Sequence, residues 1–319
     1  MNARVVVTDY TFPKLDREEA AARRAGADFA AFQCRTAEDV AAAVAGADVA
    51  LVQFAPFGPA AAAALKPGGT VIRYGVGYDN IDLGAAGDHG LRVGYVPDYC
   101  ADEVAEHTVS AALALLRKLP ALDASVRSGT WAAAQTARPM KPFADTVFGF
   151  FGLGQIGRAV QQRLAGLGFR FIASDPMLSE ADAAALGVRR VDTATLLREA
   201  DVLCLHAPAT RETTGFFNAA NLAAMQPHAI IVNSARGQLI VEDDLAEALR
   251  AGTIGGAALD VFNVEPLPAD SPLRTAPNVL LTPHAAWYSD AAIDRLQGLV
   301  AEDVARALRG EGPRRPVRR

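Results

Sequence analysis

Short runs of β-branched and aromatic residues alternate with stretches rich in alanine and leucine along most of this 319-residue chain. Short apolar runs between turn signals are typical of buried strands, and the longer stretches between them predict helices. Strands that alternate regularly with helices form parallel sheets, because each connection must cross one face of the sheet before the next strand begins. The pattern therefore predicts an α/β protein.

The first hundred residues contain five predicted strands, with helices expected at 15–25 and 37–45. The strands are Arg4–Thr8, Asp28–Phe32, Val49–Phe54, Val71–Tyr74 and Leu91–Tyr95. This unit resembles a small flavodoxin-like βα domain. A long helix is predicted next, over 101–119, with Pro120 near its end.

The segment 125–144 loses its periodicity and contains Gly129, Pro139 and Pro142. We expect an irregular excursion between domains here, with a possible role as a dimerisation arm. Six further strands are predicted beyond it, and a long amphipathic helix follows at 290–309. These strands are Thr146–Phe151, Phe169–Ser174, Val202–Leu205, Ala229–Asn233, Gly256–Leu259 and Val279–Leu281.

Two domains are expected from this order of elements. Residues 1–100 plus 285–319 would form a discontinuous substrate domain, and residues 101–284 would form a nucleotide-binding domain inserted into it, both with parallel sheets. In such folds the reaction usually takes place in a cleft between domains.

Composition narrows the class of protein. Apolar residues make up 51% of the chain and charged residues 21%, which is ordinary for a globular protein, and the net charge of −5 gives no basic field for nucleic acid. No apolar run approaches a membrane span, and the amino terminus lacks the features of a signal peptide. Three widely spaced cysteines fit free thiols in the reducing cytoplasm, and the lack of a C-x-x-C pair disfavours a cysteine zinc site. The basic tail 314–319 is expected to be a frayed terminus.

The string Gly152-Leu-Gly154-Gln-Ile-Gly157 predicts a dinucleotide site, because a buried strand enters it and a helix over 155–167 leaves it. Gly152 permits a tight turn, Gly154 lets a diphosphate approach the backbone, and Gly157 allows close packing of helix and strand. The N–H groups at the start of the helix would bind the phosphates. The alternative is a tight turn without a ligand.

Asp175 closes the next strand, where a carboxylate accepts hydrogen bonds from the adenosine ribose and repels the 2′-phosphate of NADP. Residues 176–178 add no basic side chain, so the sequence favours NAD.

Arg236 ends the stretch 231–236 at the carboxyl end of a predicted strand, where ligands bind in α/β sheets. Two N–H donors of a guanidinium match the two oxygens of a carboxylate, so Arg236 would hold the carboxylate of a small acid and polarise its carbonyl. The alternative is an arginine in a surface salt bridge.

His284 follows the last predicted strand, and imidazole is the side chain that exchanges a proton near neutral pH. Glu265 would accept a hydrogen bond from its second nitrogen, which fixes the tautomer and favours the imidazolium. A lone histidine is usually structural, and we expect this for His107, although it could approach the cofactor or the cleft. His206 is also open to a structural role, although it ends a strand and could approach the cofactor. His89 and His228 are interpreted as surface residues.

Several longer stretches carry a family resemblance: 74–82, 152–157, 233–237, 256–261 and 282–284. As a set they resemble the D-isomer-specific 2-hydroxyacid dehydrogenases over nearly the whole chain. The resemblance implies a Rossmann-type nucleotide-binding domain, NAD as cofactor, a homodimer, and catalytic roles for Arg236, Glu265 and His284. It also implies that Asp260 contacts the nicotinamide carboxamide and that the Val76–Gly77 backbone binds the substrate carboxylate. Further cofactor-binding candidates are Gln155, Ile156, His206 and Ala235.

Within the family, 71–80 and 284–289 most resemble the C-terminal-binding protein branch. That likeness implies that Arg73 and Trp287 contact substrate, although Trp287 could instead be a packing aromatic. Tyr74, Tyr78 and Trp287 suggest a pocket that tolerates apolar or aromatic side chains. The strand 148–151 departs from the usual aliphatic pattern because it is rich in phenylalanine.

The expected activity is reversible hydride transfer between NAD(H) and C2 of a small 2-oxo acid, with domain closure excluding water. The alternative is an NAD(H)-sensing protein that binds partners, as eukaryotic members of the resembled branch do. Formate dehydrogenases share the fold but carry glutamine in place of Glu265, which disfavours that activity.

Overall fold

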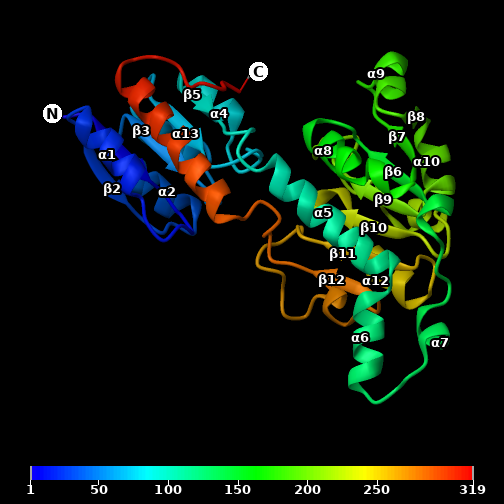
Figure 1. The fold of residues 1–319 in the computed structure, drawn as a ribbon. Coiled ribbons are helices and arrows are strands. Elements are labelled where there is room, and N and C mark those ends of the chain that lie inside the picture. Colours follow the sequence, from blue (N-terminus) through cyan, green and yellow to red (C-terminus); the bar gives the residue numbers. More distant parts are fainter. Residues whose placement is uncertain (1, 318–319) are drawn as a thin grey trace. The chain divides into compact units, whose positions relative to one another are not determined.

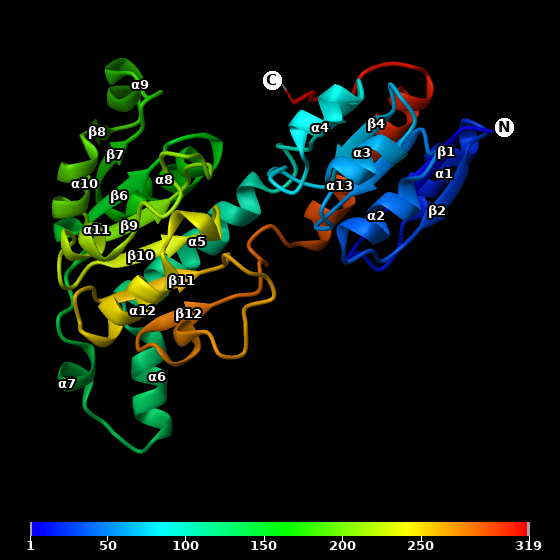
Figure 2. The same ribbon diagram turned by 180° about the vertical axis from the view of Figure 1, so that it is seen from behind.

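The structure, a computed structural model, describes residues 2–317. The chain divides into two compact units, one made of 1–100 with 288–319 and the other of 101–287. Each unit contains one parallel sheet with helices packed against it (Figures 1 and 2). The predicted α/β class with two parallel sheets is confirmed, and each unit is described by itself below.

The sheet of the first unit has the order β2-β1-β3-β4-β5, the arrangement found in flavodoxin-like folds. Its strands are β1 (Arg4–Val7), β2 (Asp28–Ala31), β3 (Val49–Val52), β4 (Thr70–Arg73) and β5 (Arg92–Gly94). Its helices are α1 (Asp16–Arg24), α2 (Ala37–Val44), α3 (Pro59–Ala64), α4 (Leu83–Asp88) and α13 (Asp290–Leu308). Helices α1 and α13 pack against each other.

The sheet of the second unit has the order β12-β11-β10-β9-β6-β7-β8. Its strands are β6 (Val147–Phe151), β7 (Arg170–Ser174), β8 (Val188–Arg190), β9 (Val202–Leu205), β10 (Ile230–Asn233), β11 (Gly256–Leu259) and β12 (Val279–Leu281). The order reverses between β6 and β9, so the carboxyl ends of these two strands form the switch point at which doubly wound sheets bind ligands.

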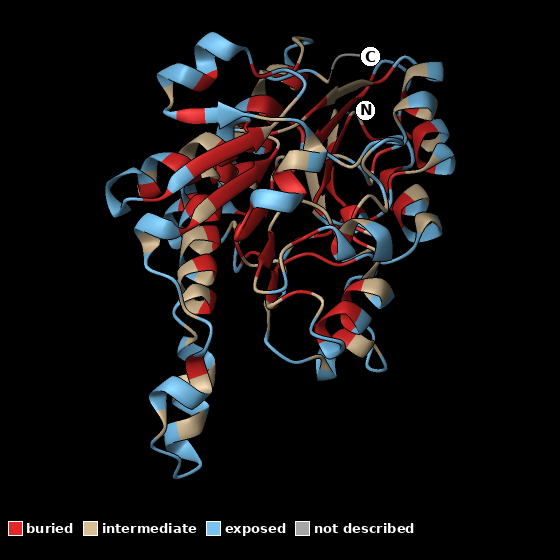
Figure 3. Ribbon diagram, turned by 90° about the vertical axis from the view of Figure 1, so that its right-hand side faces the viewer, coloured by how far each residue is buried: buried red, intermediate tan, exposed pale blue. Residues whose placement is uncertain are grey.

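Helices cover both faces of the second sheet. These helices are α5 (Ala101–Leu116), α8 (Gln155–Leu164), α9 (Glu180–Ala185), α10 (Thr193–Glu199), α11 (Ala219–Ala223) and α12 (Glu242–Arg250). Helix α5 packs against α8, β10 and β11. Strands appear as the buried layer in Figure 3, and most helices expose one face. Two apolar clusters result, one on each side of the sheet.

The phenylalanines of β6 are divided between these clusters. Phe148 and Phe150 belong to one cluster, where Phe148 lies edge-on to Phe169 at a centroid distance of 5.4 Å. Phe151 faces the other, and its ring stacks on that of Phe216 at 5.2 Å. The unusual aromatic strand is therefore matched by aromatic neighbours on both sides.

The expectation of an aperiodic segment at 125–144 is wrong in part. The structure has α6 (Leu119–Arg127) and α7 (Ala133–Ala137), with a short 3-10 turn at Phe143–Asp145. Pro120 lies in the first turn of α6, a position where its missing N–H costs nothing. We call 119–137 the arm. Helix α6 has no buried residue and is drawn tan and pale blue in Figure 3.

The basic tail is ordered up to residue 317, which contradicts the expectation of a frayed terminus for 314–317. Pro316 pairs antiparallel with Gly94, and the N–H of Val317 donates to the carbonyl of Val93 at 2.9 Å. The tail thus covers the outer edge of β5, where exposed N–H and C=O groups would otherwise be left unpaired. Residues 318 and 319 lie outside the described residues.

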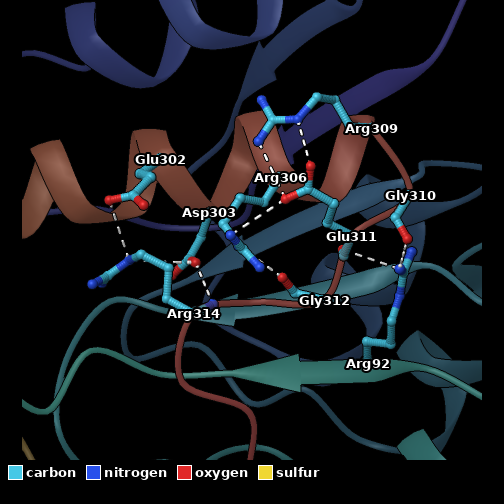
Figure 4. Close-up of polar contacts among 9 residues, drawn as sticks. All are labelled: Arg92, Glu302, Asp303, Arg306, Arg309, Gly310, Glu311, Gly312 and Arg314. Carbon is cyan, nitrogen blue, oxygen red and sulfur yellow. Dashed lines mark hydrogen bonds and ion pairs between the residues drawn. The ribbon is translucent and has the colours of Figure 1, made fainter.

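Arg314 anchors this tail to α13 (Figure 4). Its backbone N–H donates to Oδ1 of Asp303 at 2.7 Å, and its Nε lies 3.5 Å from the same oxygen and 3.7 Å from Glu302. The Asp303 side chain is fully buried, and burial raises the pKa of this carboxyl despite the charge of Arg314. Removing the arginine would leave a buried acid with less compensation.

Candidate active site

The glycine turn lies between β6 and α8, at the switch point of the second sheet. Gly152 has a φ of +88°, and a Cβ there would lie 2.9 Å from the backbone nitrogen of Ala207. A Cβ at Gly157 would lie 3.0 Å from the carbonyl of Gly152, whereas one at Gly154 meets nothing within 4 Å. A side chain at position 152 or 157 would therefore collide with neighbouring protein atoms, whereas position 154 has open space around it.

This turn fits a dinucleotide. The open space at Gly154, which precedes the first residue of α8, leaves the first N–H groups of that helix accessible to a phosphate. His206 follows β9 beside the turn, and its Cδ2 would lie 3.4 Å from a Cβ at Gly157. Its Nε2 is buried and has no hydrogen-bond partner among the described residues. Burial lowers the pKa of His206 to about 4, so the ring is neutral at pH 7.

Asp175 has a second use that the sequence did not indicate. One carboxylate oxygen accepts the N–H of Leu153, inside the glycine turn, at 2.7 Å, and the other accepts the N–H of Met177 at 2.7 Å. A carboxylate offers about four acceptor positions, so two remain for ribose hydroxyls. Asp175 thus shapes the turn as well as standing where a ribose is expected.

Arg236 lies in a short loop after β10 that is fixed by Asn233. The buried amide of Asn233 donates to the carbonyl of Arg236 at 2.8 Å and accepts the N–H of Ala235 at 3.0 Å. The guanidinium donates to the carbonyl of Ala235 at 2.6 Å. Gln155, Ile156 and Ala235 are all partly or fully exposed positions on the second unit, and their expected contacts to a cofactor stay predictions.

Gly237, in the loop that carries Arg236, packs against the backbone of a second loop at 262–263. A Cβ at Gly237 would lie 2.5 Å from the backbone nitrogen of Asn263 and closer still to the Phe262 carbonyl group. Only glycine fits here, because the two backbones touch. The N–H of Phe262 in turn donates to Oε1 of Glu265 at 2.9 Å. The loop that carries Arg236 and the loop that carries Glu265 therefore pack directly together.

His284 and Glu265 form the hydrogen bond expected from the sequence, with Nδ1 lying 2.7 Å from Oε2. Their side chains are 29% and 32% exposed, so solvent reaches the pair and screens it. Burial by itself would raise the pKa of Glu265. The hydrogen bond from His284, the charge of that ring, the N–H of Phe262 and the charge of Arg236 outweigh burial and lower the pKa of Glu265. Glu265 is thus held as a carboxylate beside the imidazole.

Asp260 follows β11 and is 3% exposed. Its carboxylate accepts the hydroxyl of Thr282 at 2.6 Å and the N–H groups of Ala285 and Ala286, each at 2.8 Å. The contact with the nicotinamide carboxamide implied by resemblance stays a prediction. What the structure adds is that Asp260 holds the turn on which His284 lies.

The remaining substrate candidates fall in both units. Trp287 ends the second unit and is half-buried, while Arg73, Val76 and Gly77 lie in the first. Among the described residues, the N–H groups of Val76 and Gly77 donate no hydrogen bond, as a carboxylate-binding backbone requires. Arg73 lies over the ring of Phe54, with its guanidinium carbon 5.8 Å from the ring centroid.

One further expectation for the first unit changes. Tyr74 is 1% exposed and its hydroxyl hydrogen-bonds Glu18 at 3.1 Å, so it belongs to the core rather than to a pocket. The aromatic side chain that is exposed beside Arg73 is Phe54, which is 42% exposed and which sequence reasoning missed. Tyr78 is half-buried against Tyr95, with ring centroids 5.2 Å apart.

Asp9 was also missed. It follows β1, is 7% exposed, and accepts the N–H groups of Gln53, Phe54 and Ala55 at 3.0, 2.5 and 3.0 Å. One carboxylate thus fixes three consecutive residues of the loop that presents Phe54. An acidic residue at the carboxyl end of a buried strand was the available signal.

His228 is not the surface residue that the sequence suggested. Its Nε2 lies 2.5 Å from Oδ1 of Asp201, a carboxylate that also accepts Lys141 Nζ at 2.8 Å and the N–H of Val147 at 2.7 Å. Burial opposes ionisation of Asp201, but these donors outweigh it and lower the pKa. This group lies at the amino ends of β6, β9 and β10, opposite the glycine turn.

Comparison with known proteins agrees with this architecture. The family model described as "D-isomer specific 2-hydroxyacid dehydrogenase, NAD binding domain" matches residues 109–286, which is the greater part of the second unit. That unit is accordingly a Rossmann-type NAD-binding domain, and NAD is the cofactor. The chain belongs to the D-isomer-specific 2-hydroxyacid dehydrogenase family.

Several relatives indicate how broad that family is. The chain is 42% identical over 252 residues to D-3-phosphoglycerate dehydrogenase of Mycobacterium tuberculosis, covering 79% of this chain and 47% of the relative. It is 38% identical over 247 residues to glyoxylate reductase of Korarchaeum cryptofilum, covering 76% of this chain and 74% of the relative. The chain thus spans about half the length of the phosphoglycerate dehydrogenases it matches.

A solved structure matches nearly the whole chain. The TT0316 protein from Thermus thermophilus has a TM-score of 0.85 at 30% identity, covering 99% of this chain and 100% of that one. The comparisons establish the family and not the C-terminal-binding protein branch, which stays a prediction. Among residues 2–317, no helix is long and apolar enough to cross a membrane.

Proposed function

We propose that this protein catalyses reversible hydride transfer between NAD(H) and C2 of a small 2-oxo or 2-hydroxy acid, with the D-isomer as the hydroxy acid. The observation that carries the proposal is the 2.7 Å hydrogen bond between His284 Nδ1 and Glu265 Oε2, in a loop packed against the one that presents Arg236. An acid-supported imidazole and a guanidinium are the groups that reduction of a 2-oxo acid requires.

In the reducing direction, Arg236 binds the substrate carboxylate through two N–H donors. Bound NADH would supply the hydride to C2, and the electron pair of the carbonyl bond would then move onto oxygen. His284 donates its Nε2 proton to that oxygen and becomes neutral. Glu265 accepts the Nδ1–H throughout, so it fixes the orientation of the ring and, after transfer, its tautomer.

Arg73 and the N–H groups of Val76 and Gly77 are proposed as further carboxylate ligands, and Trp287 as a substrate contact. In the first unit, Arg73 presents its guanidinium over the apolar ring of Phe54. A cation beside an aromatic ring supports a substrate with a carboxylate and an apolar side chain. Glyoxylate, pyruvate and phenylpyruvate therefore span the sizes that need testing.

The test is a spectrophotometric screen of 2-oxo acids from glyoxylate to phenylpyruvate, with NADH and with NADPH. Loss of NADH absorbance that depends on the acid supports the proposal. Tight NADH binding with no turnover for any acid contradicts it and favours the alternative, an NAD(H)-sensing protein that binds partners.

We also infer a homodimer. The arm exposes large apolar side chains, with Leu119 and Val126 each 55% exposed and Trp131 91% exposed. Apolar surface of this kind is stabilised when a second subunit covers it. Sedimentation of the wild type against Trp131→Ala tests this inference.

We also propose a cytoplasmic location. The three cysteines are free, which supports this proposal.

A further inference from the structure

The turn that carries His284 is held by one buried carboxylate. Asp260 accepts three hydrogen bonds through its side chain, from Thr282, Ala285 and Ala286, and its backbone carbonyl accepts the N–H of His284 at 2.8 Å. His284 has a φ of +53°, a left-handed conformation that costs a residue with a side chain roughly 1 kcal/mol. The hydrogen bonds to Asp260 therefore stabilise a backbone that would otherwise relax.

His107 reaches this network from another element. It lies on α5, and its Nε2 is 3.1 Å from the hydroxyl oxygen of Thr282 and 3.9 Å from Oδ1 of Asp260. Helix α5 packs against β11, the strand that ends just before Asp260. The side chain of His107 is 28% exposed, so most of its ring is enclosed. A helix distant in sequence thus contacts the His284 turn through one imidazole.

The direction of these hydrogen bonds follows from the number of protons. A threonine hydroxyl has one proton and two lone pairs. At 2.6 Å that proton goes to Oδ1 of Asp260, an oxygen that also accepts the N–H of Ala285. The hydroxyl therefore faces His107 as an acceptor, and Nε2 of His107 must donate. The order is His107 Nε2–H to Thr282 Oγ1–H to Asp260.

We propose that His107 is a positioning residue for His284. It fixes the Thr282 hydroxyl, which completes the set of donors on Asp260 and keeps the turn 282–286 in place. In this role His107 acts through Thr282 and Asp260 and not on the reacting atoms. The inference rests on the proposed function only in that His284 is the proton donor. Its structural part concerns the turn itself and is measured without substrate.

Three substitutions distinguish the effect of losing the hydrogen-bond donor from the effect of changing the size of the side chain. His107→Leu removes the donor, His107→Gln keeps an N–H near the position of Nε2, and Thr282→Val removes the hydroxyl at nearly constant shape. His89→Gln is the matched control, because His89 is exposed on the first unit. Each variant is assayed for kcat and KM with NADH and the best 2-oxo acid of the screen. Deuterium uptake at 282–287 is followed by mass spectrometry without substrate.

His107→Leu and Thr282→Val are expected to lower kcat about tenfold with KM within twofold, and to raise the exchange rates of the Ala285 and Ala286 amides about tenfold. His107→Gln should restore most of the wild-type kcat and most of the wild-type protection of these amides from exchange. The proposal is overturned if His107→Leu leaves exchange at 282–287 unchanged, or if His107→Gln is as impaired as His107→Leu. If exchange responds as expected but the wild type reduces no 2-oxo acid, the positioning role stands and the proposed function fails.

Discussion

Replacing Gly237 by alanine is expected to separate Arg236 from the Glu265–His284 pair. The new Cβ would lie 2.0 Å from the carbonyl carbon of Phe262 and 2.5 Å from the nitrogen of Asn263, whereas ordinary contact begins at 3.4 Å, so one loop must move by about 1.4 Å. Both neighbours are backbone atoms and cannot rotate away. Displacement of a positioning group by about 1 Å costs on the order of a hundredfold in rate.

The assay is kcat/KM for the best 2-oxo acid with NADH, alongside NADH affinity and the free energy of unfolding. Gly237→Ala should lose about a hundredfold in kcat/KM and about 1–3 kcal/mol in stability, the usual cost of overpacking. Gly166→Ala is the control, because a Cβ there meets nothing within 4 Å. A Gly237→Ala protein with kcat/KM within threefold of wild type would refute the packing argument.

Three other substitutions test separate features. Asp175→Ala should weaken NADH binding about tenfold and narrow the preference over NADPH; a wild type that prefers NADPH contradicts this reasoning. The pKa of His206 is about 4 in the folded protein and 6.5 in the unfolded chain, so the unfolded chain takes up a proton first as the pH falls. The wild type should therefore lose about 2 kcal/mol of unfolding free energy between pH 7 and 5, a loss that His206→Gln should not show. If denaturant titrations give both proteins the same dependence of unfolding free energy on pH, this prediction is wrong. Arg314→Ala should destabilise the protein by about 2–4 kcal/mol in the same titrations, because it leaves the buried Asp303 with less compensation. The control Arg315→Ala removes an exposed ion pair with Asp98 and should cost under about 1 kcal/mol. Equal losses in the two variants would argue against the role of Arg314 beside Asp303.

The central strands were predictable because burial on both faces leaves a continuous apolar run. Strands β9 and β11, whose residues are all buried, begin and end at the predicted residues. Strand β8 was missed because only Val188 of its three residues is buried, so this edge strand has no apolar run. Helix α6 was missed because Pro120 was interpreted as the end of one helix, whereas it lies in the first turn of the next.

The candidate site was predictable where a local stretch contains the whole signal, as in the glycine turn, or where two residues follow neighbouring strands of one sheet. Glu265 follows β11 and His284 follows β12, and these parallel strands are paired, so the hydrogen bond between the two side chains could be expected. Contacts that depend on how two distant elements pack were not predictable. His107 meets Thr282 only because of the way α5 lies on the sheet, and His228 meets Asp201 at the amino ends of strands. The tail was misjudged because its pairing with β5 requires the folded edge.

The central claim is that His284, supported by Glu265, gives the proton that accompanies hydride transfer. The most direct measurement compares wild type and His284→Ala for turnover of the best 2-oxo acid and for NADH affinity in the same samples. We predict that turnover falls by about a thousandfold or more while the Kd for NADH stays within threefold. Turnover near that of the wild type, with NADH bound normally, would contradict the account.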